Sequence, residues 1–82
     1  MVTELKIFDE IVEEYDFFTG VPDSALKQFI SKIEKSGKKH VIATNEGQAV
    51  AIAFGAMLAN KKVCVYLQNS GIGNCINPLT SL

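Results

Sequence analysis

Apolar residues in the first part of the chain recur at the three- and four-residue spacing of an amphipathic helix. The first such stripe consists of Leu5, Ile7, Phe8, Ile11, Val12 and Tyr15. The second consists of Leu26, Phe29, Ile30 and Ile33. Gly37 follows the second stripe at a position where a helix C-cap glycine is common. The pattern therefore predicts two surface helices, each of which packs through one face.

Three short runs of apolar and β-branched residues have the length of strands. They occupy residues 16–19, 40–44 and 62–67. The third run shows almost no alternation of polar and apolar side chains, which is typical of a strand covered on both faces. Helices and strands alternate, so we expect an α/β fold, a partial three-layer α/β/α unit with a parallel sheet. A last helical segment is expected after the glycine-containing loop at residues 69–74.

A third predicted helix, which begins at Gly47 and ends at Ala59, is apolar on nearly every face. A domain of 82 residues cannot easily bury such a helix by itself. One side can pack on the sheet, and the other then needs a second chain or a further part of the protein. The small residues Ala49, Ala53, Gly55 and Ala56 would let a partner approach closely. We therefore expect a homo-oligomer formed through this helix, and the alternative is an alanine-rich core helix.

Charge and composition exclude some classes of function. Eight lysines and nine acidic residues are interspersed along the chain, and the net charge is −1. The sequence therefore has no basic stripe that could bind the phosphate backbone of a nucleic acid. The first residues lack the features of a signal peptide, which favours a cytoplasmic protein, and no segment is long enough to span a membrane. Cys64 and Cys75 have no metal or redox spacing and are expected to be packed free thiols.

The candidate site follows from the predicted topology. In an open parallel sheet the strand-to-helix turns lie at the carboxyl edge, where ligands bind. Three turns, at residues 20–24, 44–47 and 68–71, carry most of the polar and glycine residues that have no evident packing role. His40 begins a strand at the opposite edge and is expected to be a solvated or capping histidine.

Glu46 occupies the first turn of the apolar helix at this edge. The helix dipole there favours a carboxylate and burial favours the neutral acid, which suits a group that shares a proton, although glutamate is also common in first turns for structural reasons. Asp23 and Ser24 are in the first place helix-capping residues. An unrelated nucleotide-binding or phosphate-binding α/β domain is a weaker alternative, because position 76 is Ile where G-x-G-x-x-G needs Gly.

Three motifs in order resemble thiamine-diphosphate-dependent enzymes. In that family a glutamate begins an alanine-rich helix, a strand follows, and a Ser-Gly-x-Gly loop leads into a helix. Here the motifs read Asn45-Glu-Gly-Gln-Ala, Val63-Cys-Val-Tyr-Leu and Asn69-Ser-Gly-Ile-Gly-Asn, and Thr19-Gly-Val-Pro-Asp-Ser is similar to the family's G-x-P turn. The likeness covers about residues 16 to 82 and implies the first three strands of a pyrimidine-binding domain. The amino-acid sequence of these motifs is most similar to phosphonopyruvate decarboxylase, followed by the α subunit of sulfopyruvate decarboxylase.

The resemblance implies a decarboxylase of 2-oxo acids. Glu46 would hydrogen-bond N1′ of the cofactor's aminopyrimidine and favour the tautomer that removes the proton from C2 of the thiazolium. Asp23 and Ser24 would lie near the substrate. The residues expected to bind the cofactor are Glu46, Gln68, Asn69, Ser70 and Gly71. The expected substrate carries a second anionic group, phosphonopyruvate first and sulfopyruvate second.

The resemblance also implies a partner. Family members hold the diphosphate and Mg²⁺ through a Gly-Asp-Gly…Asn motif in a separate domain, and this sequence has no Gly-Asp-Gly. We therefore expect residues 1–82 to be the N-terminal portion of a pyrimidine-binding domain with no metal ligands of its own. It would be inactive without a diphosphate-binding partner domain or chain. The alternative is a non-catalytic interaction module that has kept the fold.

Overall fold

The computed structural model of the chain describes residues 2–69 and 72–76, and side chains from position 6 to position 67. Its elements, in chain order, are α1 (Val2–Glu14), β1 (Phe17–Gly20), the 3₁₀ helix η1 (Ser24–Leu26), α2 (Lys27–Ser36), β2 (Lys39–Ile42), α3 (Glu46–Leu58), β3 (Val63–Asn69) and β4 (Ile72–Ile76). The alternation of helices and strands expected up to β3 is confirmed. No helix in these described segments is long and apolar enough to cross a membrane.

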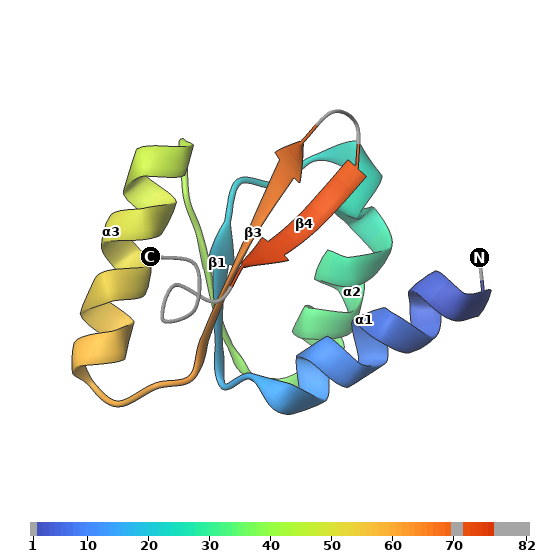
Figure 1. The fold of residues 1–82 in the computed structure, drawn as a ribbon, viewed down its shortest axis with the longest axis horizontal. Coiled ribbons are helices and arrows are strands. Elements are labelled where there is room, and N and C mark those ends of the chain that lie inside the picture. The colour runs from blue at the N-terminus through green and yellow to red at the C-terminus, as the bar shows by residue number, and fades with distance from the viewer. Residues whose placement is uncertain (1, 70–71, 77–82) are drawn as a thin grey trace.

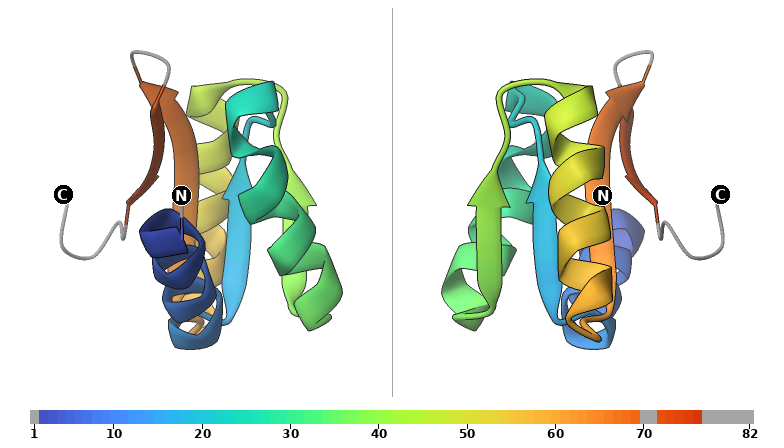
Figure 2. Two further views of the ribbon diagram at one scale, coloured as in Figure 1. Left: turned by 90° about the vertical axis from the view of Figure 1, so that its right-hand side faces the viewer. Right: turned by 90° about the vertical axis from the view of Figure 1, so that its left-hand side faces the viewer.

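A four-stranded sheet in the order β2-β1-β3-β4 forms the middle layer. The central strand β1 pairs in parallel with β2 on one side and with β3 on the other. Helix α3 covers one face of the sheet, and α1 and α2 cover the other (Figures 1 and 2). The predicted three-layer unit with a parallel sheet is therefore confirmed.

Each face of the sheet has its own hydrophobic cluster, because successive side chains of a strand point to opposite faces. Phe18 joins the cluster under α1 and α2, and Phe17 joins the one under α3. Both Cys64 and Val65 of β3 are buried, as its uninterrupted apolar pattern predicts. Cys64 is disulfide-bonded in the structure, so the prediction that it is a free thiol is wrong.

The loop expected at residues 69–74 and the start of the helical segment expected after it are wrong, because β4 occupies residues 72–76. The rest of that segment lies outside the described residues. Strand β4 pairs antiparallel with β3, from Val65 opposite Ile76 to Asn69 opposite Ile72. Without β4 the outer edge of β3 would present unpaired backbone N–H and C=O groups, and the hairpin satisfies them. The two glycines of Gly71-Ile-Gly73 predict a turn, but they do not predict whether a helix or a strand follows it.

The small residues of α3 face the sheet rather than a partner, which corrects the sequence-based expectation. Ala49, Ala53 and Ala56 are all buried against the α3 face of the sheet. Alanine allows a helix to lie close to the strands, since its side chain adds little thickness. Of the four small residues expected to meet a partner, Gly55 alone is exposed, with nothing within 4 Å of the position its Cβ would take.

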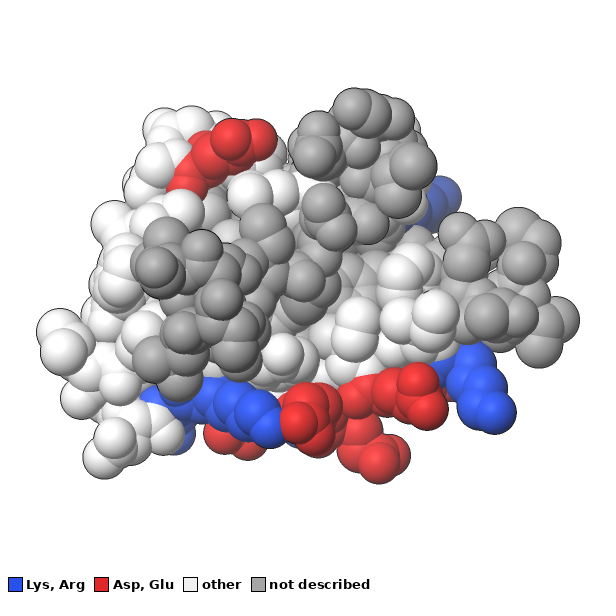
Figure 3. Space-filling model, viewed as in Figure 1, with Lys and Arg blue, Asp and Glu red and all other residues white. Residues whose placement is uncertain are grey.

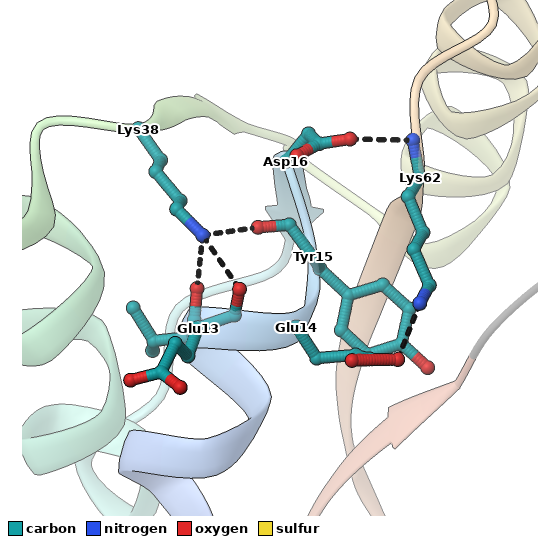
Figure 4. A network of polar contacts seen from close by, with 7 residues as sticks. Glu13, Glu14, Tyr15, Asp16, Lys38 and Lys62 are labelled. Atoms are coloured by element: carbon teal, nitrogen blue, oxygen red, sulfur yellow. Dashed lines mark hydrogen bonds and ion pairs between the residues drawn. The ribbon is translucent and has the colours of Figure 1, made fainter.

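Lys38 connects the edge of the sheet where the strands begin to the end of α1. Its ammonium donates to the carbonyl oxygens of Val12, Glu13 and Tyr15 at 2.6, 3.0 and 2.8 Å (Figure 4). These oxygens belong to the last turn of α1 and the residue that follows it, where carbonyl groups have no partner inside the helix. A lysine there also complements the negative end of the helix dipole. Acidic and basic side chains lie next to one another along this edge (Figure 3), and the contacts of Lys38 give its polar groups a structural role.

His40 is nearly buried, with 4% of its side chain exposed, so the expectation of a solvated histidine is wrong. Its Nδ1 lies 2.6 Å from Glu34 Oε2, and its Nε2 lies 2.7 Å from the hydroxyl oxygen of Tyr66. Tyr66 is fully buried in β3, and burial raises its pKa to about 12, with a further contribution from the negative charge of Glu34. The three side chains join α2, β2 and β3 across one face of the sheet.

This raised pKa predicts a loss of stability in alkaline solution. The folded chain holds the tyrosine proton more tightly than the unfolded chain, whose tyrosine has the ordinary pKa of 10.0. The stabilising contribution is therefore complete below about pH 10 and is lost as the pH rises toward about 12. Urea unfolding across this range should show a steeper fall for the native chain than for Tyr66→Phe. Equal slopes in the two proteins would contradict the assignment.

Candidate functional site

The carboxyl ends of the first three strands meet at one edge of the sheet. Gly20, the last residue of β1, lies opposite Ile42 of β2 and Tyr66 of β3. The backbone N–H of Ala43 donates to the carbonyl oxygen of Gly20 at 2.9 Å and extends this pairing by one residue. The turns that follow β1 and β2 therefore begin side by side, as the sequence predicts.

A hollow of about 300 Å³ opens at this edge. It is lined by Val21, Pro22, Asp23, Asn45, Glu46 and Leu67. These residues come from the turn after β1, from the start of α3 and from β3. The structure thus brings Asp23 and Glu46 together, although 22 positions separate them in the sequence.

Glu46 is held by a turn with several local hydrogen bonds. Asn45 caps α3, because its Oδ1 accepts from the backbone N–H of Gln48 at 2.8 Å. In return, Gln48 Oε1 accepts from the backbone N–H of Thr44 at 2.7 Å and from its hydroxyl group at 3.0 Å. Glu46 is exposed, whereas the sequence-based interpretation assumed that it is buried. The backbone that carries this carboxylate is fixed while the carboxylate itself faces solvent.

Asp23 acts as the capping residue that its position predicts. Its Oδ1 accepts from the backbone N–H of Ala25 at 2.9 Å. A second hollow of about 400 Å³ lies on its other side and is lined by Pro22, Asp23, Ser24, Lys27 and Ile30. Since both hollows include Pro22 and Asp23, they adjoin. The predicted substrate residues Asp23 and Ser24 therefore lie next to the hollow that contains Glu46.

The remaining predicted cofactor residues stay predictions. Gln68 and Asn69 belong to β3, and their backbones pair with Gly73 and Ile72, but the structure does not describe their side chains. Ser70 and Gly71 lie outside the described residues.

Sequence reasoning missed several residues that line the two hollows, among them Val21, Leu67 and Lys27. Val21 and Leu67 form apolar walls, and Lys27 contributes a positive charge. Each had a usable signal, because Val21 is part of the turn, Leu67 ends the apolar run of β3, and Lys27 follows Asp23 by four positions. Residues four apart at the start of a helix share a face.

Comparison with known proteins shows that the chain matches one protein family. The model described as "Thiamine pyrophosphate enzyme, N-terminal TPP binding domain" matches residues 6–82. The chain is 46% identical over 70 residues to the sulfopyruvate decarboxylase subunit alpha of Methanocaldococcus jannaschii, which covers 82% of this chain and 40% of that protein.

A second relative has a related name. The chain is 45% identical over 64 residues to the phosphonopyruvate decarboxylase of Streptomyces viridochromogenes, which covers 77% of this chain and 16% of that protein. It thus matches well under half of the length of either relative. No solved structure matches the chain.

Proposed function

Since this chain belongs to the thiamine pyrophosphate enzymes, whose N-terminal TPP binding domain matches residues 6–82, we propose that it forms part of a 2-oxo acid decarboxylase in which Glu46 activates the cofactor. One observation carries the proposal. The carboxylate at the start of α3 shares a hollow at the carboxyl edge of the sheet with the turn after β1. Ligands of open parallel sheets bind at this edge.

The residues of the hollow fit the aminopyrimidine end of thiamine diphosphate. A pyrimidine ring has two apolar faces and a polar rim, and the hollow offers the apolar side chains of Val21 and Leu67 beside the Glu46 carboxylate. When bound, thiamine diphosphate supplies the nucleophilic carbon and the electron sink that decarboxylation of a 2-oxo acid needs.

The chain's own part is to hold and move one proton. With the cofactor bound, the Glu46 carboxylate would accept a hydrogen bond from N1′ of the aminopyrimidine and would share that proton with it. A general acid–base group must be held within hydrogen-bond reach of its partner. The hydrogen bonds among Thr44, Asn45 and Gln48 support this role, because they fix the backbone that carries Glu46.

We assign the diphosphate and Mg²⁺ to a partner domain or chain. The sequence contains no Gly-Asp-Gly motif, and one relative is named as a subunit alpha. The substrate we propose is a 2-oxo acid with a second anionic group, phosphonopyruvate first and sulfopyruvate second, since the relatives are named for these two acids.

Reconstitution tests the proposed function. Calorimetry with Mg²⁺ present should show weak binding of thiamine diphosphate to this chain alone and strong binding once a diphosphate-binding partner is added. The complex should release CO₂ from phosphonopyruvate or sulfopyruvate. A complex that binds the cofactor and decarboxylates neither acid would support the non-catalytic interaction module instead. Low-micromolar binding by the chain alone would show that the diphosphate site is wrongly assigned.

The outer face of α3 is the surface we propose for self-association. Val50, Phe54 and Leu58, spaced four residues apart, are 37, 43 and 89% exposed. Residues at this spacing form one stripe along a helix. An apolar stripe of this kind favours burial against a second copy of the chain.

Phe54→Glu is expected to weaken this self-association. Light scattering at micromolar concentration should report a dimer or larger assembly for the native chain and a monomer for the variant, because the charge would be buried at the contact. Ile7→Glu is the matched control, since Ile7 is 46% exposed on α1 and lies outside the stripe. A monomeric native chain would contradict the proposal.

A further inference from the structure

Resting on the proposed function, we infer that Lys27 determines substrate specificity by binding the second anionic group of the 2-oxo acid. The phosphonate or sulfonate would lie in the hollow formed by Pro22, Asp23, Ser24, Lys27 and Ile30. The reacting end of the substrate would then lie toward the adjoining hollow, which contains Glu46. Pro22 and Asp23 line both hollows, so the proposed substrate would lie across these two residues.

The charges around the two hollows make a cation necessary for such a substrate. Asp23 and Glu46 are acidic, and Lys27 is the only basic residue among the described residues that line either hollow. The backbone N–H of Ala25 donates to one oxygen of the Asp23 carboxylate. A dianionic substrate would be repelled without a positive charge within a few ångströms.

Three other lysines of the described chain have partners that account for them, and none of the remaining ones lines either hollow. Lys32 pairs with Asp9 at 2.7 Å, Lys62 pairs with Glu14, and Lys38 binds three backbone carbonyls. Lys27 is exposed at the start of α2, and within residues 6–67 its ammonium group takes part in no ion pair or hydrogen bond.

The chemistry of a lysine ammonium suits a phosphonate or a sulfonate. It presents three N–H donors on a flexible four-carbon stem, and these anions present oxygen acceptors around a tetrahedral centre. Pyruvate has a methyl group at the corresponding position and carries only its carboxylate charge, so it gains much less from this cation. Lys27 therefore separates substrates that carry a second anion from those that do not.

The test uses the complete complex of the chain with its diphosphate-binding partner. Lys27→Met should raise KM for phosphonopyruvate and sulfopyruvate and lower kcat/KM by about 10- to 100-fold, the range for one hydrogen bond to a charged group. The value of kcat/KM for pyruvate should fall much less, so that the preference for the dianionic acids shrinks, and Lys27→Arg should retain most of that preference. Lys35→Met is the matched control, because Lys35 is exposed on the same helix and lies two turns away.

A second measurement does not depend on turnover. Acetic anhydride labelling followed by mass spectrometry should show that phosphonopyruvate protects Lys27 and that pyruvate does not, while Lys35 reacts equally with both. A native complex that prefers the dianionic acids while Lys27→Met matches Lys35→Met would overturn the inference and leave the proposed function standing. A complex that prefers pyruvate, or that decarboxylates no 2-oxo acid, would overturn the substrate class and this inference together.

Discussion

Glu46→Gln is expected to lower kcat of the complete enzyme by about 10²–10⁴-fold, the usual contribution of a general acid–base group. Glutamine has nearly the same shape and can still accept a hydrogen bond, but its amide cannot take up and return a proton. The Asn45 cap and the Gln48 hydrogen bonds do not involve the Glu46 side chain, so the fold should remain.

Steady-state kinetics of the reconstituted complex would measure this effect, and circular dichroism would check the fold. Glu10→Gln is a suitable control, because Glu10 is an exposed carboxylate of α1. Activity of Glu46→Gln within threefold of the native enzyme would reduce Glu46 to a structural residue of the first turn.

Gly20→Ala is expected to destabilise the fold strongly. A Cβ at this position would lie 2.2 Å from the carbonyl oxygen of Tyr66 and 2.5 Å from its Cδ1 atom. The carbonyl cannot move away, because Tyr66 is in the pairing between β1 and β3. Overpacking of a core typically costs about 1–3 kcal/mol and occasionally more. A backbone clash this close belongs at the upper end, which is a large part of the roughly 5–15 kcal/mol that stabilises a domain.

Urea unfolding followed by circular dichroism would test this expectation. Gly55→Ala is the matched control, since nothing lies within 4 Å of its Cβ position and it is inside α3. Alanine is favoured over glycine in a helix by about 1 kcal/mol, so the control should be slightly more stable than the native chain. If Gly20→Ala unfolded at the native urea concentration, the close approach of β1 and β3 would be wrong.

Local sequence patterns predicted the elements up to β3 because each has a short-range physical cause. The stripe of Phe29 and Ile33 indicates a helix at any position in a chain, and Gly37 indicates where that helix ends. In the structure Gly37 has φ of 76°, the left-handed conformation that glycine adopts without strain. The edge that carries Asp23 and Glu46 follows from the order of these elements alone.

What the sequence did not predict depends on contacts between distant residues. The pairing of β4 with β3 and the hydrogen bond between His40 and Tyr66 both need the sheet to exist first. The exposure of Glu46 is a similar case, because it depends on which face of α3 packs on the sheet. An almost uniformly apolar helix has no polar face that would identify the side packed on the sheet. In the structure the packed side is the one that carries small residues such as Ala53.

The reactivity of the Lys38 ammonium depends on whether α1 is docked on the rest of the chain. All three of its hydrogen bonds go to backbone oxygens of residues 12, 13 and 15. Acylation of its nitrogen would remove the positive charge, and the resulting amide would have only one N–H to share among three acceptors. An acylating reagent should therefore react more slowly with half-buried Lys38 while α1 is docked than with exposed Lys39. A smaller difference in rate between these neighbours would report that the first helix has loosened.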